Sequence, residues 1–170
     1  MKVEKLVGQM LPDVGLVATD GRLINPTRNK GLCVYFCYPY TGRPGQPDPP
    51  GWDNIHGAHG STPQALGYSE AYDFYQKLGV KVYGVSFQDV FWQSEFVKRS
   101  ALKVPLLSDH ARKFARALAL ETFKAGTEEY LTRVTLIARD GTIVAMRSPA
   151  EAPALDGKET LALIENLAAP

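Results

Sequence analysis

His56-Gly57-Ala58-His59-Gly60-Ser61-Thr62-Pro63-Gln64 is the junction between a long loop and a long helix. A hydroxyl residue, Ser61, stands three positions before Gln64, which is the spacing of a capping box. Pro63 falls in the first turn, where its missing N–H costs nothing. We therefore expect Ser61 or Thr62 to cap the helix. Unpaired N–H groups and the helix dipole favour an anionic nucleophile at such a helix start, and the chain has serine there.

Composition indicates one globular domain over residues 1–170. The chain is 45% apolar and 22% charged, which allows a sizeable core. Its net charge is +1 without long runs of like charge, so we expect no nucleic-acid partner. No apolar stretch approaches the roughly 18 to 20 residues that span a bilayer, and the first residues do not resemble a secretory signal. We therefore expect no membrane partner and a cytoplasmic location.

Residues 32–38 are apolar on both faces, which is typical of a central strand covered by helices on either side. Residues 40–60 are rich in proline and glycine and form a long loop of the kind that is often functional. The remaining pattern predicts strands at 14–18, 80–87, 105–109, 130–138 and 142–147, with helices at 62–78, 90–100, 110–118 and 157–167. This order predicts an α/β fold with a mixed central sheet and helices on both faces.

Apolar residues repeat along the helix expected at 62–78. Its predicted core face consists of Leu66, Tyr72, Phe74, Tyr75 and Leu78. Further aromatic residues at helical spacing, Phe91, Trp92 and Phe96, are expected in the core or at a subunit contact.

Cys33 and Cys37 are the two cysteines of the chain, and both fall within the apolar strand at 32–38. We expect them to be buried as small hydrophobic residues, without a disulfide framework. The alternative is that Cys37, close to the strand end, acts as a substitute thiol.

Several motifs in combination resemble those of the peroxiredoxin (AhpC/TSA, redoxin) family. They are Phe36-Cys37-Tyr38-Pro39, Gly84-Val85-Ser86, Val104-Pro105-Leu106-Leu107-Ser108-Asp109, and Arg133-Val134-Thr135-Leu136-Ile137 ahead of Asp140-Gly141-Thr142-Ile143. The chain is most similar to the bacterioferritin-comigratory or Q type. This resemblance implies a thioredoxin-like fold and thiol-dependent reduction of hydrogen peroxide or alkyl hydroperoxides. It also implies no cofactor, a thiol reductant such as thioredoxin, and a monomer or homodimer.

The same resemblance implies the site residues. Aligning residues 60–64 with the family's Gly-Cys-Thr-Pro-Gln places Ser61 at the peroxidatic cysteine, and Leu66 at the resolving position five residues later. Arg133 matches the family arginine that holds the thiolate and the peroxide. The local counterpart of the motif threonine is Ala58.

Two further residues shape the expected pocket from the other side of the loop. Thr41 could supply the hydroxyl that Ala58 lacks, and Pro39 ends the central strand beside it. The resemblance therefore implies a catalytic set of Ser61, Arg133, Thr41 and Pro39. Trp52, within the loop, is a candidate lid over the pocket.

Serine at position 61 changes the expected function. Peroxide reduction needs a nucleophile that is anionic near neutral pH and can become a sulfenic acid, and serine does neither. We therefore expect thiol peroxidase activity to be lost, either by an engineered replacement or by natural divergence. The alternative function is a catalytically silent binding or regulatory module with a small anion pocket.

Other chemistries fit the sequence less well. His56, His59 and Asp53 have spacings that could bind a metal, but no further well-placed ligand completes a usual site, so we expect solvated loop side chains and no metal. A Gly-x-Ser-x-Gly nucleophile motif is absent, because Pro63 occupies its last position.

Overall fold

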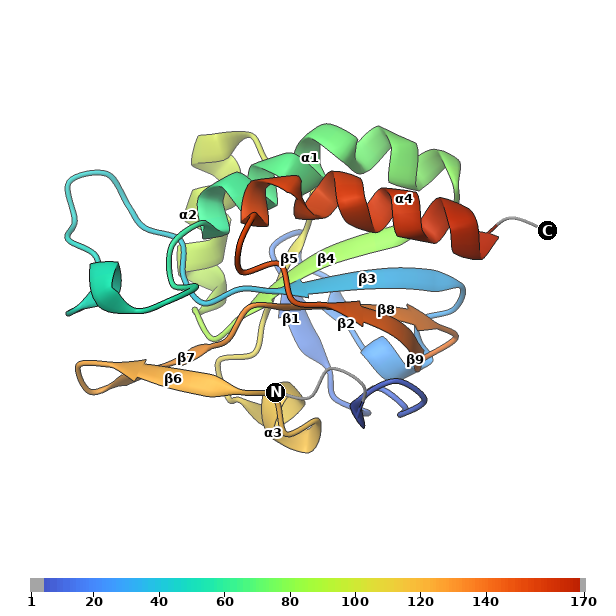
Figure 1. The fold of residues 1–170 in the computed structure, drawn as a ribbon, viewed down its shortest axis with the longest axis horizontal. Helices are drawn as coiled ribbons and strands as arrows, with labels where there is room; N and C mark the ends of the chain where they lie inside the picture. The colour runs from blue at the N-terminus through green and yellow to red at the C-terminus, as the bar shows by residue number, and fades with distance from the viewer. Residues whose placement is uncertain (1–4, 169–170) are drawn as a thin grey trace.

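A mixed seven-stranded sheet forms the centre of the protein in a computed structural model, which describes residues 5–168 (Figure 1). The neighbouring strands β3, β4 and β5 run parallel, and all other pairs in this sheet are antiparallel. The mixed sheet expected from the sequence is confirmed. In spatial order its strands are β2 (Leu23–Ile24), β1 (Leu16–Ala18), β5 (Leu106–Ser108), β4 (Lys81–Ser86), β3 (Leu32–Cys37), β8 (Val134–Arg139) and β9 (Thr142–Arg147).

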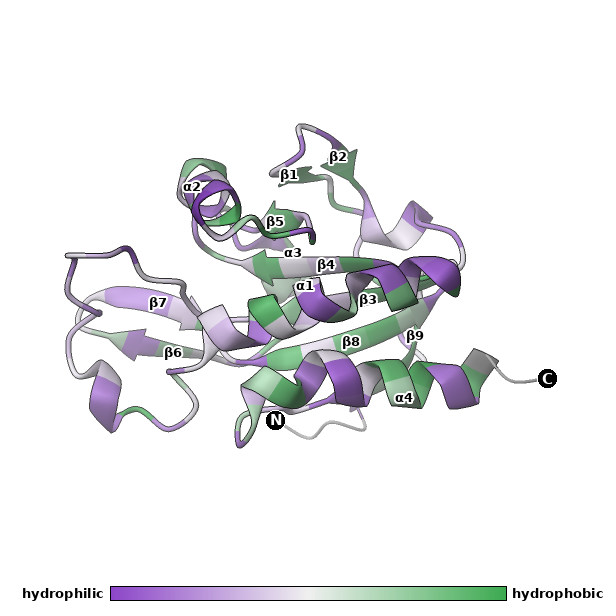
Figure 2. Ribbon diagram, turned by 90° about the horizontal axis from the view of Figure 1, so that it is seen from above, coloured by the Kyte–Doolittle hydropathy of each residue, from purple (hydrophilic) through white to green (hydrophobic). Residues whose placement is uncertain are grey.

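Helices cover both faces of this sheet, as the sequence predicts. The long helices α1 (Ser61–Lys77) and α4 (Asp156–Ala168) lie side by side on one face (Figures 1 and 2). Helix α2 (Val90–Ser100) packs on the same side, and the short helix α3 (Lys113–Ala117) packs on the other. None of the helices within residues 5–168 combines the length and apolar character needed to cross a bilayer.

Strand β3 explains why two separate cores form. Successive side chains of a strand point to opposite faces, and in β3 all but the first residue are buried. Val34 and Phe36 join the core beneath α1, α2 and α4, whereas Cys33, Tyr35 and Cys37 join the core on the α3 side. The expectation that both cysteines are buried in a central strand is confirmed.

The buried face of α1 differs from the predicted one. Leu66, Phe74 and Leu78 are 38%, 58% and 43% exposed, so the prediction is wrong for these three. The buried positions follow a different stripe, in which tyrosine hydroxyls are hydrogen-bonded to α4 and small residues allow close helix approach. This stripe consists of Gln64, Ala65, Gly67, Tyr68, Ala71 and Tyr75.

A second, two-stranded sheet was not expected. The strand predicted at 130–138 is wrong as one element, because the chain breaks before β8. Its first part, β7 (Glu128–Leu131), pairs with β6 (Thr122–Ala125) as a hairpin outside the main sheet. The turn contains Gly126 at φ 63°, a conformation that favours glycine. The helix predicted at 110–118 is also shorter, because only Lys113–Ala117 is helical.

The loop at residues 40–60 packs on this hairpin (Figure 1). Its Trp52, in a short 3-10 turn at Trp52–Asn54, is 4% exposed and lies 5.0 Å from the Tyr130 ring, centroid to centroid. The loop and hairpin thereby form a third hydrophobic cluster, which we call the loop–hairpin cluster. It contains Tyr40, Trp52, Ile55, Ala58, Phe123, Ala125 and Tyr130.

Candidate active site at the start of α1

Ser61 is the first residue of α1, and the residue that precedes the helix is Gly60. The prediction that Ser61 or Thr62 caps the helix is therefore wrong. Gly60 has φ 111°, and a Cβ at this position would lie 2.5 Å from Cγ of Pro153. A glycine is needed at this junction for both reasons.

The Ser61 hydroxyl is buried and unpaired. Ser61 is 3% exposed, and its Oγ has no hydrogen-bond partner within residues 5–168. It lines a cleft of about 200 Å³ together with Tyr40, Asp48, Trp52 and His59. Trp52 thus lies at the cleft as expected, but its ring is fixed in the loop–hairpin cluster and forms a wall of the cleft. A buried hydroxyl without a protein partner can bind a water, an ion or a ligand.

Arg133 links the loop before Ser61 to the first turn of α1. Its Nη1 donates to Oε1 of Gln64 at 2.5 Å, and its Nη2 donates to the carbonyl oxygens of Gly57, Ala58 and His59 at 3.2, 3.2 and 3.0 Å. These contacts fall on both sides of Ser61 in the sequence.

The Arg133 guanidinium is a buried cation without a direct anionic partner among the described residues. Arg133 is 3% exposed, and its Nε has no hydrogen-bond partner in this part of the chain. Burial lowers the pKa of Arg133 to about 10, because the charged form is desolvated. Arg133 itself does not line the cleft that contains Ser61, so its expected role in holding a peroxide stays a prediction.

Gln64 connects Arg133 to a buried carboxylate. Its Nε2 donates to Oδ2 of Asp156 at 3.1 Å, which sets the orientation of the amide. Oδ2 of Asp156 also accepts from Tyr68 Oη at 2.6 Å, and Oδ1 forms an ion pair with Arg147 Nε at 3.1 Å.

No sequence pattern predicts this connection. The spacing of Gln64 also fits a capping box, and Asp156 lies 92 residues further along the chain.

Thr41 is buried but engaged elsewhere. Its Oγ1 donates to Oε1 of Gln88 at 3.1 Å, and its carbonyl accepts from Gln88 Nε2 and from Trp92 Nε1 at 3.1 and 2.7 Å. Pro39 lines a neighbouring cleft with Trp92, while Tyr40 lines both clefts. Neither Thr41 nor Pro39 lines the cleft that contains Ser61, and their proposed catalytic roles stay predictions.

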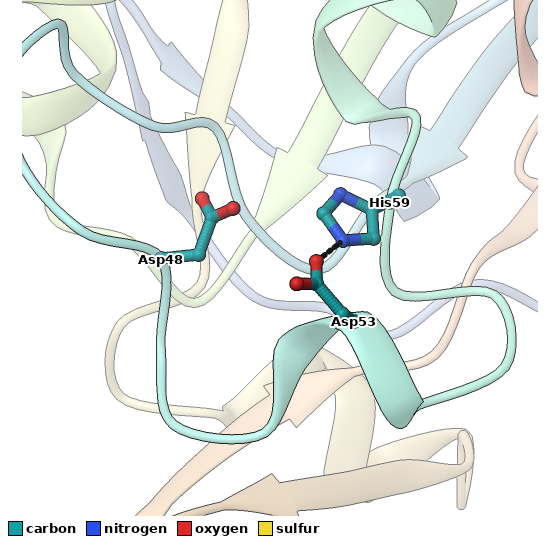
Figure 3. Close-up of side chains that lie close together, drawn as sticks. All are labelled: Asp48, Asp53 and His59. Atoms are coloured by element: carbon teal, nitrogen blue, oxygen red, sulfur yellow. Dashed lines mark hydrogen bonds and ion pairs between the residues drawn. The ribbon is translucent and has the colours of Figure 1, made fainter.

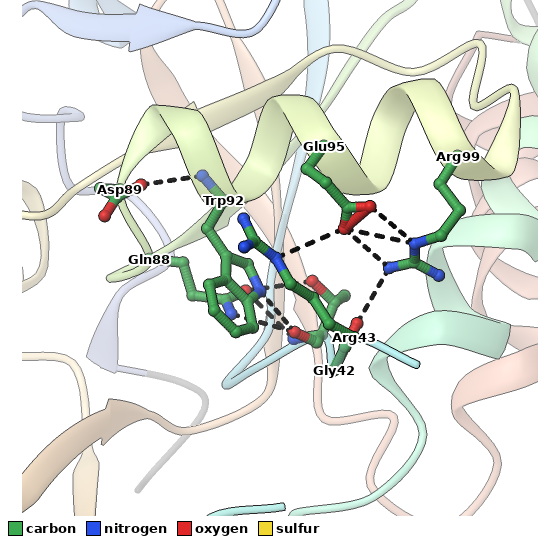
Figure 4. Close-up of polar contacts among 8 residues, drawn as sticks. Gly42, Arg43, Gln88, Asp89, Trp92, Glu95 and Arg99 are labelled. Carbon is green, nitrogen blue, oxygen red and sulfur yellow. Dashed lines mark hydrogen bonds and ion pairs between the residues drawn. The ribbon is translucent and has the colours of Figure 1, made fainter. Parts of the chain in front are cut away.

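The start of the loop is fixed to α2 (Figure 4). The Arg43 guanidinium stacks over the Trp92 ring at 3.9 Å and forms an ion pair with Glu95 at 3.4 Å. Arg99 binds Glu95 and donates to the carbonyl oxygen of Gly42 at 3.0 Å. The wall of the cleft is therefore anchored at two places, on α2 and on the hairpin.

The two cysteines lie in the interior. Cys37 has no exposed surface, and burial raises the pKa of its thiol. Burial also raises the pKa of the Cys33 thiol. Both thiols therefore favour the neutral form, which is a weak nucleophile, and this disfavours Cys37 as a substitute.

The loop histidines have separate partners. His59 Nε2 lies 2.7 Å from Oδ1 of Asp53, and the Asp48 carboxylate lies near both (Figure 3). His56 instead pairs with Glu151 at 3.1 Å. Asp48, which the sequence did not single out, therefore takes the place expected for His56 in this group.

The region around the start of α1 is similar to a known protein family. A family model described as "AhpC/TSA family" matches residues 57–146, a range that includes Ser61 and Arg133. Peroxiredoxin Q, chloroplastic, from Oryza sativa subsp. japonica is 30% identical over 128 residues, which are 74% of this chain and 51% of the rice protein. The chain thus spans about half the length of that relative. The cytoplasmic location that the sequence predicts for the present chain stays a prediction.

Solved structures show the same fold. The bacterioferritin comigratory protein of Xanthomonas campestris superposes with a TM-score of 0.73 and 21% identity, covering 94% of this chain and 97% of that one. The peroxidoxin BcpB of Mycobacterium tuberculosis gives a TM-score of 0.75 and 19% identity, with 95% and 97% covered. The thioredoxin-like fold expected from the sequence is confirmed.

Proposed function

The chain belongs to the AhpC/TSA family, and from this membership we propose that it keeps a peroxide-binding pocket but lacks thiol peroxidase activity. The observation that carries the proposal is the buried, unpaired Ser61 hydroxyl in the first turn of α1. This position aligns with the family's peroxidatic cysteine, and Arg133 holds the backbone just before it.

The missing atom decides the chemistry. In thiol-dependent reduction the thiolate sulfur attacks one peroxide oxygen, the O–O bond breaks, the other oxygen takes a proton and leaves as water or an alcohol, and sulfur becomes a sulfenic acid. A serine hydroxyl ionises far above neutral pH. A helix dipole contributes only about 0.3 to 1 kcal/mol, which changes a pKa by less than one. Ser61 therefore offers neither the anion nor the oxidisable atom.

The rest of the chain does not replace this atom. Cys33 and Cys37 are both buried in β3, away from the cleft residues around Ser61. Leu66, at the expected resolving position, carries no thiol. A thiol reductant such as thioredoxin would be a partner only of a form that carries cysteine at position 61.

A second candidate function is a binding or regulatory module for a small anion. Two buried polar atoms favour it, Oγ of Ser61 and Nε of Arg133, which both lack partners within residues 5–168. Both belong to the region around the start of α1, where the helix dipole favours negative charge. This module would bind its ligand without turnover.

Peroxide consumption with a dithiol reductant tests the first proposal. We expect the protein and its Ser61→Ala variant to be equally inactive, and Ser61→Cys to consume peroxide and to form a sulfenic acid detectable by mass spectrometry. Equal turnover by the protein and by Ser61→Cys would show that the missing sulfur is unimportant. A folded but inactive Ser61→Cys variant would show that the pocket itself has diverged.

A further inference from the structure

Three side chains of the 40–60 loop lie close together (Figure 3), and two of them, Asp48 and His59, line the Ser61 cleft. They are Asp48, Asp53 and His59, and one potential ligand atom from each lies within 4.8 Å of the other two. All three side chains are exposed, so an ion from solution can reach them.

Charge at this position is poorly compensated. The Asp48 carboxylate makes no hydrogen bond or ion pair with any other residue in the range 5–168, and Asp53 contacts only His59. The described residues that line the two clefts beside Asp48 include neither lysine nor arginine. A cation would therefore relieve repulsion between two neighbouring carboxylates.

The backbone is restrained at two of these residues. Asp48 stands between Pro47 and Pro49, which restrict the conformations of the loop. The carbonyl oxygen of His59 accepts from Arg133 at 3.0 Å, which fixes the backbone of this residue while its imidazole stays accessible. Less backbone entropy is therefore lost when these two residues bind an ion.

A separate observation at the same cleft also favours a bound ligand. Ser61 lines the cleft together with Asp48 and His59, and its buried Oγ lacks a partner among the described residues. A water or anion carried by a bound ion would supply that partner.

We propose that Asp48, Asp53 and His59 form a site for a divalent transition-metal ion, with zinc as the probe. An imidazole with two carboxylates suits such ions better than calcium, which prefers six to eight oxygen ligands. Tetrahedral zinc places its ligand atoms about 3.3 Å apart. The His59–Asp53 pair at 2.7 Å would open slightly, and Asp48 would move closer. The fourth coordination position of the ion would face the cleft.

Zinc titration of the full chain, after removal of metal by a chelator, tests this site. We expect one zinc ion per chain by calorimetry. When cobalt replaces zinc, we expect the absorption band that cobalt shows in a coordination site of low symmetry. His59→Ala and Asp48→Asn should each weaken binding by more than about tenfold. His56→Ala is the matched control, because His56 is an exposed histidine of the same loop that pairs with Glu151. It should bind zinc like the unchanged protein.

Three results would overturn the proposal. They are no binding at millimolar zinc, unchanged binding in folded His59→Ala, and an equal loss in His56→Ala. Circular dichroism of each variant checks folding. The titration contains no peroxide and no reductant, so its outcome is independent of the proposed loss of peroxidase activity.

Discussion

Arg133 is the residue through which the site is assembled, since it contacts the loop before Ser61 and the first turn of α1. All its hydrogen bonds go to neutral oxygen atoms, and a carboxylate is reached only through Gln64. Its charge therefore has no carboxylate in direct contact among the described residues.

Because the Arg133 charge has no direct carboxylate partner, we expect it to affect the acidity of a thiol at position 61. In Ser61→Cys, the introduced thiol should ionise below the ordinary value of about 8.5. Adding Arg133→Gln should raise its pKa by about 1, because a nearby opposite charge is lost. Thiolate absorbance against pH measures both values. Arg139→Gln, a change at an exposed arginine, is the control and should leave the pKa unchanged; an equal change there would contradict a local effect.

Asp156 supports the same site from α4 as a fully buried carboxylate. Asp156→Asn should lower the free energy of unfolding by about 3 kcal/mol. Arg147 loses its buried anionic partner, and an amide offers only one oxygen to the groups that donate to the carboxylate. Urea denaturation measures the loss. Glu159 is the other anionic partner of Arg147, and its side chain is 49% exposed. Glu159→Gln should therefore lower the free energy of unfolding by less than about 1 kcal/mol. Similar losses in both variants would contradict a special role for the buried carboxylate.

The sequence predicted some of these residues and not others. Ser61 and Arg133 could be placed because each falls in a motif that resembles a family pattern. The spacing of Gln64 predicts a capping box, since spacing alone cannot distinguish a cap from contacts to residues distant in the sequence. Asp156 had no local signal for this role, because its partners other than Thr160 lie on other elements.

Among the elements, the start of α1 depends most on a single backbone conformation. Gly60→Ala should lower the free energy of unfolding by more than about 2 kcal/mol, because a Cβ would clash with Pro153 and φ is strongly positive. Gly45→Ala has a positive φ but open space around it, and should cost about 1 kcal/mol. Thermal unfolding compares the two, and equal losses would show that the Pro153 contact is unimportant.

The anchoring of the loop to α2 gives a prediction for local opening. Trp92→Phe removes the Nε1 donor to the Thr41 carbonyl oxygen, so amide hydrogen exchange over residues 40–60 should increase about fivefold. Phe91→Leu changes a neighbouring side chain that is 81% exposed and should leave exchange unchanged. Unaltered exchange in Trp92→Phe would mean that this hydrogen bond does not limit the opening of the loop.

Element prediction succeeded where local signals were complete. Helix α2 was expected at 90–100 and found there, with the Asp89 side chain accepting from the Trp92 amide as its cap. The hairpin of β6 and β7 was missed, although Gly126-Thr127 is a possible turn signal, because its strands are only four residues long. The predicted core face of α1 was right for Tyr75 and wrong for Leu66, Phe74 and Leu78, because apolar spacing does not show which small and polar residues face α4.

At the scale of the whole molecule, large apolar side chains remain on the surface. Phe74 and Phe91 are 58% and 81% exposed. We expect a monomer or a homodimer, with a mass in solution of once or twice 18.7 kDa. Light scattering measures it, and Phe74→Ser and Phe91→Ser test whether either ring stabilises a dimer. A larger assembly would contradict this expectation.

The loop–hairpin cluster also has a consequence for how the chain folds. Its two sides, around Trp52 and Tyr130, come from distant parts of the sequence, and none of its buried residues belongs to the two cores that flank the sheet. Bringing these two sides together closes a long segment of chain, which is entropically costly. Once β3 and β8 have paired, the ends of this segment already lie close to each other and the remaining cost is smaller. The cluster should therefore be the last part of the protein to form during folding, and the cleft beside Ser61 would be completed only in that final step.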